Sequence, residues 1–592
     1  MAAEGMHAPE VMDGFWLPQR LREELGQPLN GYASLSFASG RPSQPGHAGA
    51  ISASWPLWGP GQWKTLLGRL NENRRSAPQG DEFWRRLQAA LQVVGERLAE
   101  PTDPTRQMAL QFIPGYTGYS TEMIQFTLEA LQLMSLEQLP AALSLQPTHR
   151  ATRAWQSMPG LPGRLRFFPA PGWRSRLGTF SIRDDYPIFA PPDYPALAVG
   201  YGAGNVPGTA MLIALLSLST TLAGEPPPVV IVKNSRLEPI FAPLMLGALE
   251  QVDPDLLSTL AVLVWDYEDA AVQEVLLGEA EVVIAAASDE TITQIRAQVE
   301  RAYNLRARQF LANKSKGTPS PPLRPMRFHA HGHKVSFSVI GREVLQKNLL
   351  EAGSGMLLVD IVSLLAALDS VFWDQNGCLS SRVHFVEESG RAGYSAVEYA
   401  ERLAAQMRML AAALPRGAWP RQLLHDRFDR YKQLEKTSQV QVLSGYEDEF
   451  LVAVDRRTLG EAGVRAQVND CQGRVIVVRP VADLMEVPEG YLRWLAPANL
   501  QSLSVAVGQP GTGLSESFLR FAEACGKRGV TAIRTAGRGA FPQLAYSWDG
   551  LIPLDLLHPR VGGHFTTLEF DDPYEQILET YRAVLAKLNP AG

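Results

Sequence analysis

The sequence predicts an α/β protein built on parallel sheets, and three observations lead to this fold class. From Tyr194 onward, short apolar runs alternate with segments of helical periodicity. Runs such as PPPVVIVKNS and AEVVIAAAS are apolar throughout, as expected of strands that are buried on both faces of a parallel sheet. The chain has 592 residues, which is too many for one core, so two or three domains are expected.

Composition argues against several classes of protein. The formal net charge of −6 argues against non-specific nucleic-acid binding, which requires a basic face. The cysteines, Cys378, Cys471 and Cys525, lie far apart and form no CxxC pair. They therefore predict neither a disulfide framework nor a zinc site, and they indicate a reducing, cytoplasmic location.

No targeting or membrane segment is expected. The N-terminal stretch MAAEGMHAPEVMDGFWLPQR carries acids and has no apolar core, unlike a signal peptide. The most apolar window runs from Thr209 to Gly224, which is too short to span a bilayer and contains several hydroxyl groups. We interpret this window as a helix buried on all sides within a large domain.

The N-terminal part of the chain predicts helices and one long connection. Residues 1–110 contain two helical segments, WKTLLGRLNENRR and EFWRRLQAALQVVGERLAE, and Ser120 begins a further helix with a partial capping pattern. Residues 153–195 are rich in Pro, Arg and aromatic residues, and they are expected to run over the surface.

Strands and helices alternate in the next part. The expected strands are PALAVGYGAG, PPPVVIVKNS, TLAVLVW and AEVVIAAAS, and a helix follows each of them. Ligands of such sheets bind beyond the carboxyl ends of the strands. The turns after these strands are therefore the first places in which to seek functional residues.

A Pro-, Ser- and Lys-rich connector at 313–328 precedes a second α/β region. HKVSFSVIG alternates as a half-buried strand, and the helix LLVDIVSLLAALDSVFWD leads directly to Cys378 and the strand RVHFVEE. Ser395 and Glu398 form a full capping box at the start of the next helix. Strands EFLVAV, RVIVVRP, SLSVAVG and VTAIRTAG follow, and the amphipathic YEQILETYRAVLAKL is expected to dock as a C-terminal helix.

Polar residues follow two of the buried strands. Asn205 lies in the turn YGAGNVPG, where its amide could donate to an oxyanion or simply make the turn. Lys233, Ser235 and Arg236 follow the next strand, where Lys can reach a ribose or phosphate and Arg offers a planar fork to a phosphate. The alternative for this second group is a solvated strand end with a helix cap at Ser235.

Two further segments have competing interpretations. Ser288 and Asp289 begin a helix whose free N–H groups could bind an anion, although Asp289 would repel one and a plain helix cap explains both residues. The histidines of HAHGHK, at 329–334, invite a metal interpretation, but no Cys or acidic partner stands at ligand spacing. We therefore expect no metal site there.

Cys378 has the same ambiguity when it is taken alone. It stands where a long apolar helix ends and a strand begins, a position where a thiol could be presented as a nucleophile. A free cysteine is more often a buried packing residue, so the stretch DQNGCLSSRVHFVEE does not decide between the two.

The order of these segments resembles a known family. Asn205 in GNVP, Lys233 in VKNSRLEP, Ser288 in SDE, then HGHKVSFSVIGREVL and Cys378 in DQNGCLSSRVHFVE resemble the aldehyde dehydrogenase superfamily. The closer resemblance is to the LuxC-type bacterial acyl-CoA reductases, which reduce fatty acyl thioesters to aldehydes. It extends from about residue 115 to about residue 565.

The resemblance implies a role for each matched residue. Cys378 corresponds to the nucleophile and Asn205 to the oxyanion-hole amide, and Lys233 corresponds to the lysine that holds the adenosine ribose. Arg236 stands where NAD-preferring relatives often carry an acid, so a guanidinium there predicts NADPH as the cofactor. The full set of predicted cofactor-binding residues is Gly204, Val206, Lys233, Ser235, Arg236, Ser288, Asp289 and Thr291.

One departure from the superfamily bears on the reaction. Hydrolytic aldehyde dehydrogenases carry a glutamate that activates water just before the segment that here reads Ala330-His331-Gly332-His333-Lys334. Without that base, water would not be activated to hydrolyse an acyl-enzyme, and the acyl-enzyme could be reduced by a hydride instead. The sequence therefore favours reduction of a thioester. His331 or His333 is a candidate proton donor or guide for the leaving thiol.

The expected organisation has an aldehyde-dehydrogenase-like fold with a cofactor domain, a catalytic domain and an oligomerisation arm. We expect a variable region at 1–110, an NADP-binding domain at 111–328, a catalytic domain at 329–530, and a C-terminal arm or docking segment at 531–592. The function predicted is reduction of a fatty acyl-CoA to an aldehyde through acyl-Cys378, with CoA as the leaving group. Alternatives are an aldehyde dehydrogenase that forms an acid or acyl-CoA, and a non-catalytic acyl-binding subunit.

The expected partners follow from the same resemblance. The acyl donor is a fatty acyl-CoA or an acyl-protein thioester, an acyl-protein synthetase is a possible partner, and the chain is expected to form a homo-oligomer. Neither the acyl chain length nor the role of residues 1–110 is indicated by the sequence.

Overall fold

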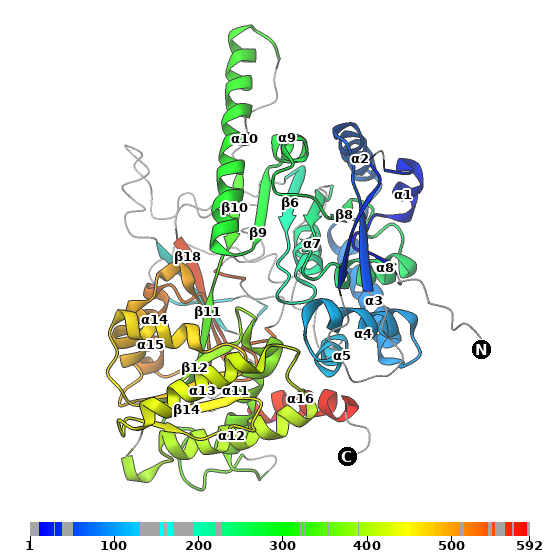
Figure 1. Cartoon of the computed structure of the whole chain (residues 1–592). Coiled ribbons are helices and arrows are strands. Elements are labelled where there is room, and N and C mark those ends of the chain that lie inside the picture. The colour runs from blue at the N-terminus through cyan, green and yellow to red at the C-terminus, as the bar shows by residue number, and fades with distance from the viewer. Residues whose placement is uncertain are drawn as a thin grey trace, which may run out of the picture. The chain divides into compact units, whose positions relative to one another are not determined.

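The computed structural model of the chain shows two compact units (Figure 1). Unit 1 contains the described residues of Met1–Ile124 and Ala190–Gly332, and unit 2 those of Gln125–Phe189, His333–Pro553 and Arg560–Gly592. The described residues are 11–28, 30–37, 51–130, 154–158, 160–161, 163–169, 195–219, 226–319, 323, 326–351, 355–388, 390–508, 514–542, 548–550, 563–570 and 573–588. The division falls between Gly332 and His333, and the N-terminal region belongs to the same unit as the first predicted sheet.

Unit 1 is organised around a five-stranded parallel sheet in the order β10-β9-β6-β7-β8. Its strands are β6 (Leu197–Tyr201), β7 (Val229–Lys233), β8 (Leu260–Leu263), β9 (Val282–Ala286) and β10 (Arg327–His331). Every residue of β6, β7, β8 and β9 is buried, as the continuous apolar runs predicted. The connecting helices are α7 (Thr209–Ser219), α8 (Phe241–Val252), α9 (Ala270–Glu279) and α10 (Asp289–Ser315).

The N-terminal region packs against this sheet and its helices. It contains β1 (Val11–Asp13), α1 (Gln19–Leu25), β2 (Tyr32–Phe37), β3 (Ile51–Pro56), α2 (Pro60–Asn73), α3 (Gly80–Ala99), α4 (Pro104–Thr117) and α5 (Thr121–Ala130). The two predicted helices are α2 and α3, and the small sheet β1-β3-β2 was not predicted. α3 and α4 contact α8, and the backbone groups of Trp16 and Val262 exchange hydrogen bonds at the edge of β8.

Unit 2 contains a ten-stranded sheet in the order β13-β14-β15-β12-β11-β16-β17-β18-β5-β4. The strands from β14 to β18 in that order are parallel, and β13, β5 and β4 are antiparallel to their neighbours. Their bounds are β4 (Gln156–Ser157), β5 (Arg164–Pro169), β11 (Val335–Ile340), β12 (Ser381–Glu387), β13 (Val440–Val442), β14 (Leu451–Asp455), β15 (Val475–Val481), β16 (Leu500–Ala506), β17 (Ala532–Thr535) and β18 (Gly563–Glu569).

The helices of unit 2 are α11 (Leu358–Val371), α12 (Ala396–Ala413), α13 (Arg421–Glu435), α14 (Glu461–Asp470), α15 (Glu516–Arg528) and α16 (Tyr574–Leu588). The capping box at the start of α12 forms as predicted, with Ser395 accepting from the Glu398 backbone. The C-terminal helix α16 packs against α11, and its Tyr581 hydroxyl donates to the Gly537 carbonyl at 2.5 Å.

Two local predictions differ from the structure, and two helices were not predicted. β11 is buried at every position rather than half-buried, because it lies between β12 and β16 in the middle of the sheet. Residues 164–169 form the strand β5 rather than a surface connection, because they pair with β18. Helices α13 and α14 were not predicted, although α13 buries Leu424, Phe428 and Tyr431 at helical spacing.

Among the described residues, none of the helices combines the length and apolarity needed to cross a membrane. The predicted buried helix α7 is described only to Ser219, so the rest of its apolar window lies outside the described residues.

Candidate active site

The carboxyl edge of the unit 1 sheet gathers residues that were predicted for cofactor binding and for catalysis. Asn205 follows β6, Lys233 ends β7, Ser288 follows β9, and His331 ends β10. Because these strands are parallel neighbours, their carboxyl ends lie along one edge. The topology therefore brings together residues that are far apart in the sequence.

The turn after β6 approaches the turn after β7 closely. A Cβ on Gly204 would lie 2.3 Å from Ser235 Oγ, and a Cβ on Gly208 would lie 2.9 Å from the Phe241 ring. Gly208 also has a φ of 87°, a conformation that favours glycine. The turn is tied down by Tyr119, whose hydroxyl donates to the Asn205 carbonyl, and by Thr209, whose hydroxyl donates to the Val206 carbonyl. Asn205 itself is exposed.

Lys233 is buried at the end of β7. Its Nζ lies 4.2 Å from the centre of the Tyr267 ring, and its side chain is 5% exposed. The pKa of Lys233 is lowered to about 8, chiefly by burial and then by the charge of Arg236, and Asp266 opposes this shift. Lys233 is therefore a cation held inside the sheet edge rather than a solvated strand end.

Arg236 is exposed beside Lys233. Its guanidinium donates to Asp266 at 2.5 Å, and it lies 5.6 Å from the Trp55 ring of the N-terminal region. The Arg236–Asp266 pair is 43% and 64% exposed, so solvent screening leaves it worth about 0–1 kcal/mol. The guanidinium can thus exchange this partner for a more strongly charged anion.

The start of α10 has the geometry of a capped helix. The Ser288 hydroxyl accepts from the Thr291 backbone at 3.3 Å, which confirms the N-cap, and it also donates to the Thr291 hydroxyl. Asp289 faces the end of β10, because a Cβ on Gly332 would lie 2.2 Å from Asp289 Oδ1. The positions of Ser288 and Asp289 are compatible with cofactor binding, but helix capping alone is enough to explain why a serine stands at position 288.

The histidines of HAHGHK divide between the two units. His331 is buried at the end of β10, and its carbonyl accepts from the Ala287 backbone at 3.1 Å. His333 is exposed in unit 2, and its carbonyl accepts from Asn499 Nδ2 at 2.7 Å. In the described part of the chain, no group of three or more His, Cys, Asp or Glu side chains is arranged to hold a metal ion.

Cys378 follows an unusual backbone turn in unit 2. Trp373, Asp374 and Gln375 have φ values of 56°, 47° and 60°, so three consecutive non-glycine residues are left-handed. Each such residue costs roughly 1–2 kcal/mol, and such strain persists only where surrounding contacts impose it. The turn reverses the chain between α11 and β12. Cys378 lies shortly before Ser381, the first residue of β12, which pairs with Ser336 of β11.

A buried ion pair holds this turn. Asp374 is 1% exposed and accepts from Arg474 Nε at 2.7 Å and from the Gly417 backbone at 3.0 Å. Its own carbonyl accepts from the Gly473 backbone at 2.9 Å. Arg474 is fully buried and is itself left-handed, with a φ of 70°. The strained turn is therefore anchored to the loop before β15.

Cys378 differs from the other cysteines. It is partly exposed, whereas Cys471 and Cys525 are buried. The pKa of Cys378 is raised to about 11, chiefly by burial of the thiol and then by the charge of Asp549. A hydrogen bond from the Gln501 side chain, the charge of Lys334 and the residue's own backbone N–H act in the opposite direction. The thiol is therefore protonated at neutral pH in this state.

The sequence analysis did not assign a role to the residues around Cys378. Gln501 is the second residue of β16, Asp549 lies in a turn that precedes β18 in the chain, Arg382 lies in β12, and Lys334 lies just before β11. These residues are separated from Cys378 by up to more than a hundred positions and form no spaced motif. The one usable signal was Gln501, a polar residue at the second position of an apolar strand.

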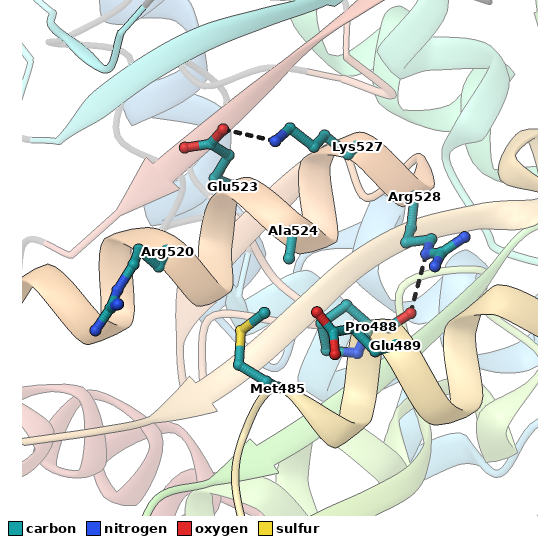
Figure 2. A pocket seen from close by; sticks show the side chains of 8 residues that line it. All are labelled: Met485, Pro488, Glu489, Arg520, Glu523, Ala524, Lys527 and Arg528. Carbon is teal, nitrogen blue, oxygen red and sulfur yellow. Dashed lines mark hydrogen bonds and ion pairs between the residues drawn. The ribbon is translucent and has the colours of Figure 1, made fainter.

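A surface hollow in unit 2 lies elsewhere (Figure 2). It has a volume of about 550 Å³ between α15 and the short helical segment Val487–Tyr491. Its lining is of mixed charge, and the figure shows Glu523 paired with Lys527 and Arg528 bonded to Pro488. None of the predicted site residues lines it.

Solved structures with a similar fold are aldehyde dehydrogenases and a related oxidoreductase. Aldehyde dehydrogenase 21 from Physcomitrella patens is 11% identical, with a TM-score of 0.53 over 95% of this chain and 98% of that one. A salicylaldehyde dehydrogenase from Pseudomonas putida G7 is 12% identical, with a TM-score of 0.51 over 92% and 96%. An oxidoreductase from Marinobacter aquaeolei is 10% identical, with a TM-score of 0.52 over 92% and 95%. The predicted aldehyde-dehydrogenase-like fold is confirmed.

The sequence profile of one family matches most of the chain. It is described as acyl-CoA reductase (LuxC), and it matches residues 180–310 and 324–560. No curated protein sequence matches the chain. The matched segments include Asn205, Lys233 and Cys378. The chain therefore belongs to the acyl-CoA reductase (LuxC) family of enzymes, as the resemblance predicted.

Proposed function

We propose that the chain reduces a fatty acyl-CoA to an aldehyde with NADPH, through a thioester on Cys378. The observation that carries this proposal is the position of Cys378: a partly exposed thiol directly after a strained, ion-pair-anchored turn, in a chain of this family. Strain imposed by surrounding contacts is typical of functional sites. The other two cysteines are buried and serve as packing residues.

The first step is transfer of the acyl group to Cys378. The thiolate attacks the thioester carbonyl, and the side-chain amide of Asn205 and the backbone N–H of Cys378 hold the oxyanion, as in the superfamily. The C–S bond to CoA breaks, and the departing thiolate takes up the proton that Cys378 lost. Acyl-Cys378 and free CoA result.

The second step reduces this thioester. When bound, a nicotinamide cofactor supplies a hydride to the acyl carbon. The resulting hemithioacetal releases the aldehyde and returns the Cys378 thiol after uptake of one proton, for which the exposed His333 and the buried His331 are candidate donors. The segment 330–334 contains no glutamate that could activate water in place of the hydride.

The donor groups at the unit 1 sheet edge fit a phosphorylated cofactor. Lys233 offers an ammonium group suited to ribose hydroxyls, and Arg236 offers a planar fork suited to a 2′-phosphate. The N-terminus of α10 is the proposed contact for the pyrophosphate, because the backbone N–H groups at a helix N-terminus favour an anion. Gly204, Val206, Ser235, Asp289 and Thr291 remain proposed contacts on the same turns.

Two variants should change the preference for NADPH over NADH in opposite directions. Arg236→Ala should lower kcat/KM for NADPH by about 10–100-fold with little effect on NADH, because it removes a charge-assisted contact to the 2′-phosphate. Asp266→Asn should instead favour NADPH, because it removes the carboxylate that competes for Arg236. The measurement is initial rates with both cofactors. Equal losses with NADPH and NADH would refute the assignment of Arg236.

The central test follows NADPH consumption with acyl-CoAs of increasing chain length. The expected result is aldehyde and free CoA in equal amounts, with an optimum at some chain length. Incubation with acyl-CoA alone should give an intact-mass increase of one acyl group on Cys378. Acid or acyl-CoA formed from an aldehyde, with no reduction of acyl-CoA, would support the oxidative alternative. Absence of any acylation would support a non-catalytic, acyl-binding role.

Several parts of the proposal concern partners. An acyl-protein thioester is an alternative donor to acyl-CoA, and an acyl-protein synthetase is the kind of partner that would supply it. We also propose a homo-oligomer in the cytoplasm, with the C-terminal segment 531–592 contributing the arm. The domain limits 1–110, 111–328 and 329–530 remain part of the same proposal.

A further inference from the structure

The N-terminal region lies against the part of unit 1 that carries Arg236. The residues that match the family begin at 180, so membership of the family assigns no role to this earlier part of the chain. Its middle strand, β3, lies between β1 and β2. Trp55, near the end of β3, is 3% exposed, and the guanidinium carbon of Arg236 lies over its ring at 5.6 Å from the centre. A buried ring of the N-terminal region therefore contacts a proposed cofactor residue.

A buried asparagine joins the turn that carries Arg236 to the same region. Asn234 is 1% exposed, and its Nδ2 donates to the Gly14 carbonyl at 3.2 Å and to the Pro239 carbonyl at 2.8 Å. Its Oδ1 accepts from the next backbone N–H at 3.1 Å. Both amide hydrogens and the amide oxygen thus have partners, and these bonds fix the turn to the backbone of the N-terminal region.

Close packing at Gly14 fixes the ring and the turn relative to each other. The Gly14 N–H donates to the Ser54 carbonyl of β3 at 2.8 Å. A Cβ on Gly14 would lie 3.2 Å from Trp55 Cε3 and 3.4 Å from Pro239 Cβ. Trp55 and the end of the turn therefore pack against the same glycine, which leaves little room for either to move.

We propose that Trp55 is a positioning residue that holds Arg236 for the 2′-phosphate of the cofactor, so that the N-terminal region helps to set the preference for NADPH. Indole is the side-chain ring that attracts cations most strongly. Asp266 holds the same guanidinium in a largely exposed ion pair, which a phosphate can replace. The ring limits the positions of the guanidinium before the cofactor binds, so less conformational freedom is lost when the phosphate contact forms. This inference rests on the proposed function, in which Arg236 binds the 2′-phosphate.

The test is the dissociation constant of the full chain for NADPH and for NADH, measured by titration. Trp55→Met should weaken NADPH binding about three- to fivefold and change NADH binding by less than about twofold, because a cation–π contact to Arg236 is lost. Methionine fills irregular gaps in a core, so it replaces much of the lost packing without an aromatic face. Equal losses for both cofactors, or no loss for either, would overturn the proposal.

The decisive comparison uses Arg236→Ala as a background. Trp55→Met should have no further effect on NADPH binding there, because the ring acts through the guanidinium. A further loss of the same size would show that the ring supports the fold and does not position Arg236. Trp55→Phe keeps a ring that attracts cations less strongly, and it should lose about twofold with Arg236 present and nothing in its absence. This milder change gives the same answer if Trp55→Met does not fold.

Two controls complete the test. Trp58→Met removes another buried indole of the same region, which packs against Trp63 at 5.5 Å, and it should leave the ratio of NADPH to NADH affinity unchanged. Arg236→Ala by itself separates this inference from the proposed function. If it leaves the ratio unchanged, the assignment of Arg236 fails and the role of Trp55 fails with it. If it lowers the ratio while the Trp55 variants do not, only the role of Trp55 is refuted.

Discussion

Replacing Cys378 by alanine should abolish aldehyde formation from acyl-CoA and NADPH. Loss of a catalytic nucleophile lowers turnover by more than about 1,000-fold, because the remaining groups bind substrate but cannot form the thioester. The intact-mass increase caused by acyl-CoA should also disappear. The same preparation should keep its thermal midpoint within a few degrees, since a partly exposed side chain of this size contributes little to packing.

Two controls make this result specific to the thiol. Cys378→Ser keeps the shape of the side chain but offers a hydroxyl that is much less ionised, so it should be nearly as inactive as the alanine variant. Binding of NADPH, measured by titration, should be unchanged in both variants. Aldehyde production by Cys378→Ala at a native rate would show that another group carries the acyl chain.

Local signals in the sequence were sufficient to predict most of the strands in the parallel sheet of unit 1. The buried strands β6, β7, β8 and β9 were apparent as continuous apolar runs, and the helix starts at Ser288 and Ser395 were apparent from capping patterns. These features depend on residues within a few positions of each other. The gathering of the turns at one sheet edge then follows from parallel topology.

The errors came from contacts between distant segments. HKVSFSVIG has serines at alternate positions, which is typical of a strand with one solvated face. In the structure, Ser336 donates to the Cys378 carbonyl at 2.8 Å and lies 2.9 Å from the Ser502 hydroxyl. The polar face of β11 is therefore inside the protein and holds the backbone of Cys378, which periodicity alone does not reveal.

The environment of Cys378 was the least predictable part of the site. The motif identified the thiol through its resemblance to a family, but neither Gln501 nor Asp549 belongs to a recognisable spacing. The left-handed run Trp373–Asp374–Gln375 was also unpredictable, because Trp and Gln rarely adopt this conformation. Only the tertiary contacts of Asp374 account for it.

Arg474→Met should destabilise unit 2 and impair catalysis together. The change leaves the Asp374 carboxylate buried without its cation, which typically costs about 3–5 kcal/mol. Because Asp374 also anchors the turn before Cys378, kcat should fall more than the KM for acyl-CoA rises, as expected when the nucleophile loses its position. Denaturant unfolding and steady-state kinetics measure the two effects.

A surface pair provides the matched control for this change. Arg465→Met breaks an ion pair with Glu461 in which the side chains are 59% and 53% exposed, and it should cost no more than about 1 kcal/mol. The double variant Asp374→Asn with Arg474→Met should recover much of the lost stability, because no unpaired charge remains buried. It should not recover kcat, because the hydrogen bonds that hold the left-handed turn are still altered. Recovery of both quantities would mean that the ion pair stabilises the fold without positioning Cys378.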